Sequence, residues 1–430
     1  MRNEYYETDV PREKALLVGV DLGDGSWDLQ DSLAELERLA NTDGADVVAT
    51  LTQNLNKPVA KTFVGKGKAE EISRFVSNMD LDVVIFDDEL SPSQQSNLEK
   101  IIGKKCKVID RTALILDIFG QHAKTKEGRL QVQLAQLQYV LPRLRGMWSN
   151  LVTEQQRGGI GGRFGAGESQ LEVDRRQVRA RISSLKRDLK KLEAQRNTQS
   201  KARWMSGVYS VALAGYTNAG KSTLLNRLSD SDVYVQDELF ATLDPTTRAI
   251  ELAEGRKITL TDTVGFIQKL PTHLIEAFKS TLSEVSSSDL ILKVVDASDK
   301  NFAKQLTEVN EILSQINADD IDYLIVFNKC DLLEPEELDK LKLVYRDGVF
   351  ISALEDKGID GLMYQIAQHA AKNNVLMSCL IPFDAGHLIN ICHERAQIIR
   401  EQYVPEGLYV TAKIPQDVAS RFEAYKIDEK

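Results

Sequence analysis

Short β-rich apolar runs alternate along the first 110 residues with segments whose apolar residues recur at helical spacing. The apolar runs lie at residues 15–20, 46–51, 81–86 and 105–109, and the helical segments between them at residues 32–40, 68–76 and 94–102. Alternation of this kind predicts a parallel sheet covered by helices. Residues 1–110 are therefore expected to form an N-terminal α/β domain.

The pattern changes after residue 111, where strand signals disappear and two heptad stripes of apolar residues begin. The stripes consist of Leu130, Leu134, Leu137, Leu141 and Leu144, and of Val178, Ile182, Leu185, Leu189 and Leu192. A glycine-rich segment, residues 158–167, separates them. Two striped helices around a non-helical segment predict an antiparallel helical hairpin over residues 111–200, with its tip at 158–167. Pro142 predicts a break near the end of the first helix, and residues 199–205 are expected to be a linker.

Buried-strand runs return in the second half of the chain, at residues 208–213, 258–260, 323–327 and 349–353. Continuous apolar runs of this length are typical of a parallel sheet covered on both faces. Residues 206–373 are therefore expected to form a second domain with a central, mostly parallel sheet. From residue 375 a shorter mixture of strand and helix signals predicts a small α+β domain over residues 374–430.

A phosphate-binding motif follows the run at 208–213. Residues 215–222 read GYTNAGKS, which matches GxxxxGKS in full and precedes a helical segment. Gly215 and Gly220 allow the backbone to turn its N–H groups toward phosphate oxygens. Lys221 is expected to reach the β- and γ-phosphates, and the Ser222 hydroxyl to hold Mg²⁺. The order of strand, loop and helix is the context that this motif requires.

Three further motifs follow in order, each at the carboxyl end of a predicted strand. Asp262-Thr263-Val264-Gly265 is a DxxG motif, in which the aspartate takes a magnesium-bound water and the glycine N–H meets the γ-phosphate. Asn328-Lys329-Cys330-Asp331 supplies a carboxylate that accepts from both N1–H and N2–H of guanine, whereas adenine would leave it unpaired. Ser352-Ala353 places a backbone N–H near guanine O6. The four motifs predict a GTPase that prefers GTP to ATP.

The segment 240–248, FATLDPTTR, lies where a sensor of the γ-phosphate is expected. A threonine there coordinates magnesium only while the γ-phosphate is bound, and Thr242, Thr246 and Thr247 are all candidates. Phe266 occupies the position after DxxG where a water-orienting glutamine is often found. An aromatic ring cannot orient water by hydrogen bonding, so hydrolysis is expected to be slow without a partner.

Composition indicates a soluble globular protein, and charge is unevenly distributed. Hydrophobic residues make up 42% of the chain and charged residues 27%. No apolar run is long enough to span a membrane and the N-terminus lacks a signal-peptide core, so we expect a cytoplasmic location. The net charge is −10, yet residues 143–203 contain fifteen Lys and Arg against six Asp and Glu. An arm of charge +9 on an acidic body favours binding to nucleic acid, although a solvated helix face has the same composition.

Several longer stretches carry a resemblance to a known family. They are VGKGKAEE, FDDELSPSQQ, KVIDRTALILDIF, LQVQLAQLQYVLPRL, GESQLEVDRR, GYTNAGKSTLLNRL, FATLDPTTR, DTVGF and NKCD. With these stretches the chain resembles the HflX family of GTPases, within the Obg-HflX class of translational GTPases, over nearly its full length. The resemblance implies an N-terminal α/β domain, a helical hairpin, a P-loop GTPase domain and a small C-terminal domain. It also implies binding to the large ribosomal subunit and dissociation of stalled ribosomes under stress.

The resemblance selects Thr242 as the magnesium-binding threonine. Lys221, Thr242 and Gly265 are then the expected catalytic set, and Ser222 and Thr242 the expected magnesium ligands. The complete set of residues expected to bind GTP or GDP is Gly215, Tyr216, Thr217, Asn218, Ala219, Gly220, Lys221, Ser222, Phe240, Ala241, Thr242, Leu243, Asp244, Asp262, Thr263, Val264, Gly265, Asn328, Lys329, Asp331, Ser352, Ala353 and Leu354.

The hairpin tip is expected to contact ribosomal RNA through Arg157 and Arg163, because glycines adapt to an irregular RNA surface and arginines stack on bases or pair with phosphates. The family tip resembles GGIGLRGPGE, whereas this chain has GGIGGRFGAGE, with Gly162 in place of a bulkier residue. The alternative function is a GTP-dependent switch that acts on a protein partner such as a protease. An RNA-modifying GTPase is not supported, because no methyl-donor or thiol site is visible. We expect a monomer that does not bind DNA.

Overall fold

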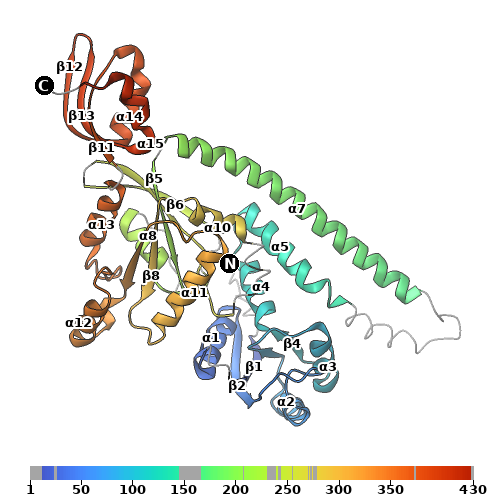
Figure 1. Cartoon of the computed structure of the whole chain (residues 1–430). Coiled ribbons are helices and arrows are strands. Elements are labelled where there is room, and N and C mark those ends of the chain that lie inside the picture. The colour runs from blue at the N-terminus through green and yellow to red at the C-terminus, as the bar shows by residue number, and fades with distance from the viewer. Residues whose placement is uncertain are drawn as a thin grey trace, which may run out of the picture. The chain divides into compact units, whose positions relative to one another are not determined.

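A computed structural model (Figure 1) describes residues 12–23, 27–144, 166–206, 208–229, 239–240, 244–253, 255–269, 271, 274, 278–371 and 374–427. The chain divides into two compact units. The first comprises Met1–Lys190 with Gln268–Ala277, and the second Lys191–Ile267 with Phe278–Lys430. A short segment from the second half of the chain thus belongs to the N-terminal unit.

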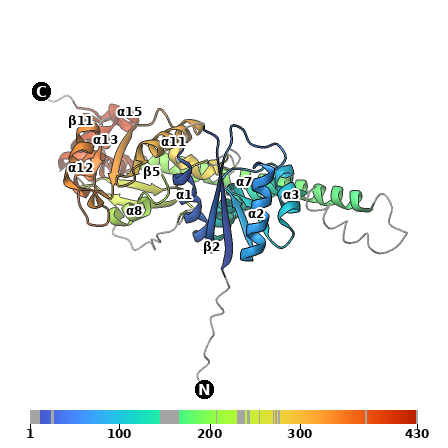
Figure 2. The ribbon, with the colours of Figure 1, turned by 90° about the horizontal axis from the view of Figure 1, so that it is seen from below.

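The N-terminal domain is a four-stranded parallel sheet in the order β2-β1-β3-β4. Its elements are β1 (Glu13–Asp21), α1 (Leu29–Thr42), β2 (Ala45–Asn54), α2 (Lys66–Met79), β3 (Val83–Phe86), α3 (Pro92–Ile102), β4 (Lys107–Asp110) and α4 (Arg111–His122). Figure 2 shows α1 and α2 on opposite sides of the sheet. The predicted α/β pattern is confirmed. Phe86 and Leu16 are fully buried beneath α2 and α3.

Side-chain caps explain where these helices begin. Ser91 accepts from the backbone N–H of Gln94, and the Gln94 side chain accepts from the backbone N–H of Ser91, forming a capping box before Pro92. Asp110 caps α4 by accepting from the Ala113 N–H. Gly65 precedes α2, and its N–H donates to Gln53 Oε1 at 2.9 Å. In the sequence Gly-Lys-Gly at residues 65–67, Gly65 is therefore the N-cap of α2, and Lys66 and Gly67 are its first two residues.

A buried charge cluster that no sequence pattern predicted lies at the carboxyl end of β3. Asp87, fully buried, accepts from Arg111 Nη1 at 2.6 Å. Arg111 also pairs with the buried Glu35. Lys269, from the segment that joins this unit late in the chain, donates to Asp87 Oδ2 and Asp88 Oδ1, both at 2.6 Å. Each buried charge in the cluster thus has a partner of opposite sign, which offsets the cost of removing it from water.

The hairpin helices are α5 (Lys126–Val140) and α7 (Ala166–Ser206). Arg181 on α7 donates to Gln133 on α5 at 2.8 Å, and Figure 1 shows α5 running beside the N-terminal half of α7. Leu185 is fully buried, as the second heptad stripe predicts. The α5 helix ends before Pro142, where a break was expected.

Two expectations for the hairpin were wrong. The segment 199–205, predicted to be a linker, is helical, because α7 continues to Ser206. The last two residues of the predicted tip, Ala166 and Gly167, are also helical and form the start of α7. In a long helix, one glycine at the end costs only about 1 kcal/mol relative to alanine, so it does not prevent the helix from starting there.

The domain that contains the phosphate loop has a six-stranded sheet in the order β10-β9-β8-β5-β7-β6. Its strands are β5 (Tyr209–Gly215), β6 (Thr246–Glu251), β7 (Lys257–Asp262), β8 (Leu290–Asp296), β9 (Tyr323–Asn328) and β10 (Val349–Phe350). Only the pairing of β6 with β7 is antiparallel, so the sheet is mostly parallel as predicted. Its helices are α8 (Lys221–Ser229), α10 (Lys279–Ser286), α11 (Phe302–Gln315), α12 (Pro335–Val344) and α13 (Ile359–Ala371).

The order of strands places a ligand crevice at the carboxyl end of β5. From β5 the chain first builds β6 and β7 on one side and then β8 on the other. In open α/β sheets such a reversal leaves a crevice at the strand ends, where ligands bind. The four predicted nucleotide motifs follow β5, β7, β9 and β10, which end at this edge of the sheet.

The C-terminal domain is a three-stranded antiparallel sheet in the order β11-β13-β12. Its elements are β11 (Asn374–Ile381), η2 (Phe383–Ala385), α14 (Gly386–Arg395), β12 (Gln397–Val404), β13 (Gly407–Pro415), α15 (Gln416–Phe422) and η3 (Glu423–Tyr425). Lys426 forms a β-bridge with Cys379, and the Ile427 N–H donates to Ser378 O at 2.7 Å. The chain therefore returns along the free edge of β11, which completes a βαββαβ arrangement. Across the described part of the chain, no helix is long and apolar enough to cross a bilayer.

Candidate nucleotide-binding site

The phosphate loop connects β5 to α8, and its two glycines are required by its geometry. A Cβ at Gly215 would collide with the backbone oxygen of Val294 on β8. Gly220 has a φ of 89°, and a Cβ there would collide with the Asn328 side chain. Asn218 also has a positive φ, of 60°. The loop is thus wound tightly against the neighbouring strands, as a phosphate cradle requires.

Lys221 lies inside this loop. Its side chain is only 6% exposed, and Nζ donates to the carbonyl oxygens of Gly215 at 3.0 Å and Tyr216 at 2.8 Å. Burial lowers the pKa of Lys221 to about 8, an effect that the nearby Asp262 carboxylate opposes. A desolvated ammonium at the N-terminus of a helix is well suited to a phosphate group, whose charge replaces the lost hydration.

Ser222 and Asp262 meet although they lie 40 residues apart. Ser222 Oγ donates to Asp262 Oδ2 at 2.6 Å, and Asp262, at the end of β7, is 1% exposed. The next residue, Thr263, ties this strand end to β5 by donating to Leu213 O at 2.6 Å. A hydroxyl and a carboxylate are the oxygen ligands that Mg²⁺ prefers. These two residues therefore fit the predicted magnesium site.

The DxxG segment lies directly against the phosphate loop. The Thr217 N–H donates to Phe266 O at 2.8 Å, and the Phe266 N–H donates to Gly215 O at 3.1 Å. A Cβ at Gly265 would lie 2.8 Å from Thr217 Cγ2 and 3.1 Å from Lys221 Nζ, so only glycine fits there. The preceding Val264 and the Phe266 side chain are both buried. Gly265 is thereby brought to the same place as the phosphate-binding lysine.

At the base-binding end, Asn328 joins three of the motifs. Its Nδ2 donates to Ala219 O of the phosphate loop at 2.9 Å, and its Oδ1 accepts from the Ala353 N–H at 3.0 Å. This bond ties the loop after β10 to Asn328, and the predicted contact of a backbone N–H there with guanine O6 stays a prediction. The sequence indicated Asn328 as a nucleotide residue, but its role in fixing the other motifs depends on contacts across 109 and 25 residues.

Asp331 carries the atom expected to recognise guanine. Its Oδ1 is shielded from solvent and has no hydrogen-bond partner among the residues that the structure describes. A buried carboxylate oxygen without a partner is costly, and the N–H groups of guanine would satisfy it. Lys329, two residues before Asp331, has a φ of 62° and pairs with Asp296 Oδ2 at 2.7 Å. Asp296 was not predicted, although it is the last residue of the buried strand β8.

The last motif forms a tight loop after β10. Ser352 is 1% exposed, and its hydroxyl accepts from the Glu355 N–H at 3.1 Å. Leu354 is 81% exposed, whereas Ala353 beneath it is buried. Of the three predicted residues, Ala353 bonds directly to Asn328, and Leu354 exposes an apolar side chain.

Some predicted residues lie outside the described part of the chain. These are Ala241, Thr242 and Leu243 of the sensor segment and Arg157 and Arg163 of the hairpin tip. The flanking Phe240 is described and buried, with a φ of 59°, and Asp244 is partly exposed.

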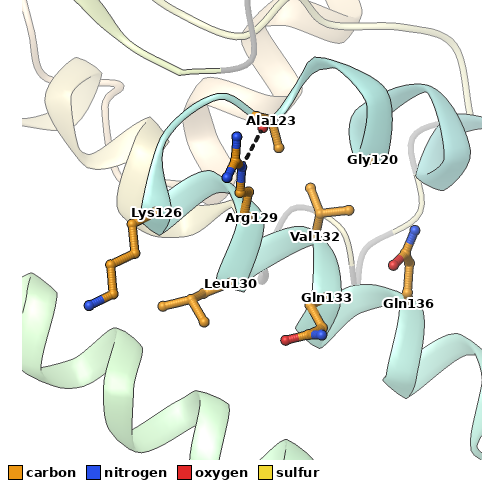
Figure 3. A pocket seen from close by; sticks show the side chains of 8 residues that line it. All are labelled: Gly120, Ala123, Lys126, Arg129, Leu130, Val132, Gln133 and Gln136. Atoms are coloured by element: carbon orange, nitrogen blue, oxygen red, sulfur yellow. Dashed lines mark hydrogen bonds between the residues drawn. The ribbon is translucent and has the colours of Figure 1, made fainter.

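A separate pocket of about 410 Å³ lies at the turn between α4 and α5 (Figure 3). Three of its polar side chains have partners: Arg129 Nε donates to Ala123 O at 3.1 Å, Gln133 accepts from Arg181, and Gln136 donates to Leu116 O. It contains none of the predicted nucleotide residues. Within the described ranges, no group of three or more His, Cys, Asp or Glu side chains is arranged to hold a metal ion.

The motif residues together form a site with two ends. One end combines inward N–H groups, a buried lysine and a hydroxyl–carboxylate pair, which suits a magnesium-bound polyphosphate. The other presents a buried carboxylate oxygen of Asp331 that no described residue satisfies, which suits a base with two adjacent N–H donors. The arrangement can therefore bind a guanine nucleotide and place its terminal phosphate beside Lys221 and Gly265.

Three family models match the chain in succession. "GTP-binding GTPase N-terminal" matches residues 30–120, "GTP-binding GTPase Middle Region" residues 122–203, and "50S ribosome-binding GTPase" residues 210–329. Among curated relatives, the GTPase HflX of Caldanaerobacter subterraneus is 43% identical over 97% of this chain and 94% of its own length. The GTPase HflX of Escherichia coli is 41% identical over 92% of each chain. A solved GTP-binding protein of Sulfolobus solfataricus in complex with GDP is 24% identical, covers 84% of this chain and 99% of its own, and has a TM-score of 0.45.

Proposed function

Because the chain belongs to the HflX family of GTPases, we propose that its GTP form binds the large ribosomal subunit and dissociates stalled ribosomes under stress. The protein hydrolyses GTP to GDP and phosphate. The observation that carries the proposal is the match of residues 210–329 to a ribosome-binding GTPase model, together with an exposed basic arm. Hydrolysis would then release the factor from the subunit.

Lys221, Thr242 and Gly265 are proposed to stabilise the transferred phosphoryl group. The buried ammonium of Lys221 and the N–H of Gly265, which the loop brings together, would bind its oxygens. Ser222 and Thr242 are proposed to hold Mg²⁺, and Asp262 to accept from a water on it. When bound, the cation neutralises charge on the β- and γ-phosphates. The contact between Ser222 and Asp262 supports this assignment.

The hairpin is proposed to make the RNA contact. The described part of α7 exposes basic side chains along much of its length, including Arg176, Arg179, Arg181, Lys186 and Arg187. The apolar stripe of the same helix is turned inward, since Leu185 is fully buried. Charge on one face and packing on the other suit an arm that binds phosphates. Arg157 and Arg163 at the tip are proposed to reach ribosomal RNA.

Ribosome binding is proposed to stimulate a slow intrinsic reaction. Phe266 lies where a water-orienting group would be expected, and its side chain is 2% exposed. A buried ring can neither donate to nor accept from the attacking water. The missing group is therefore proposed to come from the ribosome or from a rearrangement that the ribosome induces.

GTP turnover with and without purified large subunits, at low and moderate salt, tests the proposal. We expect strong stimulation that fades as salt rises, because contacts to phosphate release counterions. Replacing Arg179, Arg181, Lys186 and Arg187 with glutamine should weaken stimulation while leaving intrinsic turnover intact. Bound GTP without stimulation would contradict the ribosome role and redirect the search to a protein partner.

A further inference from the structure

The C-terminal sheet has one covered and one open face. Both helices, α14 and α15, pack on the same side of the three strands (Figure 1). Met377, Cys379 and Val410 point to that side and are buried. Because successive residues of a strand point to opposite faces, their neighbours in sequence point away from the helices.

Strand register assigns the residues of the open face. Thr411 on the central strand β13 pairs with Ser378 on β11 and with Arg400 on β12. Two residues before Thr411, Tyr409 pairs with Leu380 and with Gln402. Two residues after it, Lys413 pairs with Leu376. The open face is therefore formed by these three cross-strand rows.

Tyr409 lies along the middle of this face. Thr411 Oγ1 donates to the Tyr409 hydroxyl at 3.5 Å, and the Ser378 and Thr411 hydroxyls are 3.0 Å apart. Because Thr411 is the next residue on the same face of the strand, its contact with the hydroxyl end lays the tyrosine ring along the sheet. Leu376, at one corner, is 61% exposed. The result is an aromatic surface bordered by apolar and polar side chains.

Charge on the open face has a single sign. Arg400 and Lys413 are both exposed and occupy neighbouring rows. The acidic residues that the structure describes in the domain, up to Ile427, lie elsewhere: Asp384, Glu394, Asp417 and Glu423 in the helical segments, Glu406 in the β12–β13 turn, and Glu401 on the covered side, beside His393. The domain is nearly neutral as a whole, so the positive face results from the placement of charges and not from composition.

We propose that this open face binds single-stranded RNA. A base would stack on the Tyr409 ring, and consecutive phosphates would pair with Arg400 and Lys413. Residues at such diagonal positions of neighbouring strands are about 7–8 Å apart, and both side chains are long, so the two cations can reach separate phosphates. An aromatic side chain on the open face of a small α/β sheet, flanked by cations, is a general means of holding unpaired nucleotides. This site is distinct from the hairpin and does not depend on the proposed ribosome function.

Fluorescence anisotropy of a labelled oligouridine, titrated with the full-length GDP-bound protein, tests the site. Tyr409→Leu should lower affinity about fivefold or more, because it removes the stacking surface. Tyr409→Phe should retain affinity, because it retains the ring. The double variant Arg400→Gln/Lys413→Gln should reduce the slope of log affinity against log salt by about 1.4, the value for two phosphate contacts.

Arg421→Gln, which removes a positive charge from α15 instead, is the matched control and should bind as the wild type.

Photocrosslinking with 4-thiouridine locates the RNA, with the adduct expected within residues 407–415. Duplex RNA of equal length should compete poorly because its bases are stacked. Wild-type affinity in both Tyr409→Leu and the double variant, or adducts confined to residues 143–206, would overturn the proposal. If Tyr409→Leu fails to fold, the two exposed cations still provide the test.

Discussion

Single residues of the nucleotide site are shielded from water in ways that suit a charged ligand. Lys221 is desolvated and donates to backbone carbonyls, and Asp331 keeps an oxygen shielded from water. Both residues could be predicted from sequence, because each belongs to a short motif after a strand. The contacts of Asn328 with Ala219 and Ala353 could not, because they depend on how three distant loops meet.

The lowered pKa of Lys221 predicts that nucleotide binding weakens in mild alkali. If only the charged lysine binds phosphate, the affinity for GDP follows the fraction of Lys221 that is protonated. Because the pKa is about 8, most of the lysine is protonated below pH 8. Between pH 7 and pH 8.5 this fraction falls about fourfold, so GDP affinity should fall by a similar factor. Calorimetry in buffers of different ionisation enthalpy should also show proton uptake that grows over this range. A GDP affinity that does not change with pH, together with no proton uptake, would contradict the prediction.

Asp331→Asn should change the choice of base. Guanine loses a charged hydrogen-bond partner, so GTP affinity should fall about 10- to 150-fold, while xanthosine triphosphate, which offers an acceptor at C2, should bind better than before. Competition binding with both nucleotides measures the effect. Asp347→Asn, an exposed change in the same domain, is the control and should leave both affinities unchanged. Retained preference for GTP in Asp331→Asn would refute the assignment.

At the scale of elements, the periodicity of apolar residues predicted well which segments are helices or strands, but it predicted poorly where those segments end. The α/β alternation of the N-terminal domain and the two heptad stripes both correspond to the observed elements. The end of α7 was misjudged because polar residues near 199–205 suggested a linker, whereas no proline or glycine interrupts the helix before Ser206. The edge strand β6 was not predicted either, since its sequence TTRAIE is largely exposed and lacks a buried apolar run.

The hairpin should depend on the inward face of α7. Leu185→Ala removes a fully buried side chain and should lower local stability by about 2–5 kcal/mol. Hydrogen exchange of α5 and α7 amides measures this loss. Val173→Ala, on the same helix but 37% exposed, should have a much smaller effect. Equal protection in both variants would show that α7 is stable without its packing against α5.

At the scale of the whole molecule, the segment 268–277 was the least predictable feature. Nothing in DTVGFIQK indicates that Lys269 bonds to Asp87 and Asp88, residues more than 180 positions earlier. The cluster needs both partners: burial alone would raise the pKa of Asp87, but Arg111 and Lys269 lower it. A local motif cannot encode such a contact, because it arises only when distant segments fold together.

Lys269→Met should make the N-terminal unit more sensitive to acid. A carboxylate with a lowered pKa stabilises the fold above its unfolded pKa, and this contribution is lost as pH falls through the folded value. With one cation removed, the folded pKa of Asp87 rises, so the loss should begin at higher pH. Circular dichroism melts between pH 3 and 6 measure it. Lys66→Met, an exposed change, is the control, and identical acid profiles in both variants would contradict the prediction.

The position of Lys269 also turns the chain into a short tether. Phe266 is bonded to the phosphate loop, and Lys269, three residues later, is bonded to the N-terminal unit. Three residues of extended chain span only about 11 Å. Only Ile267 and Gln268 separate the hydrogen bonds of Phe266 from the ion pairs of Lys269, so the end of the DxxG motif and the partners of Asp87 share one short stretch of backbone.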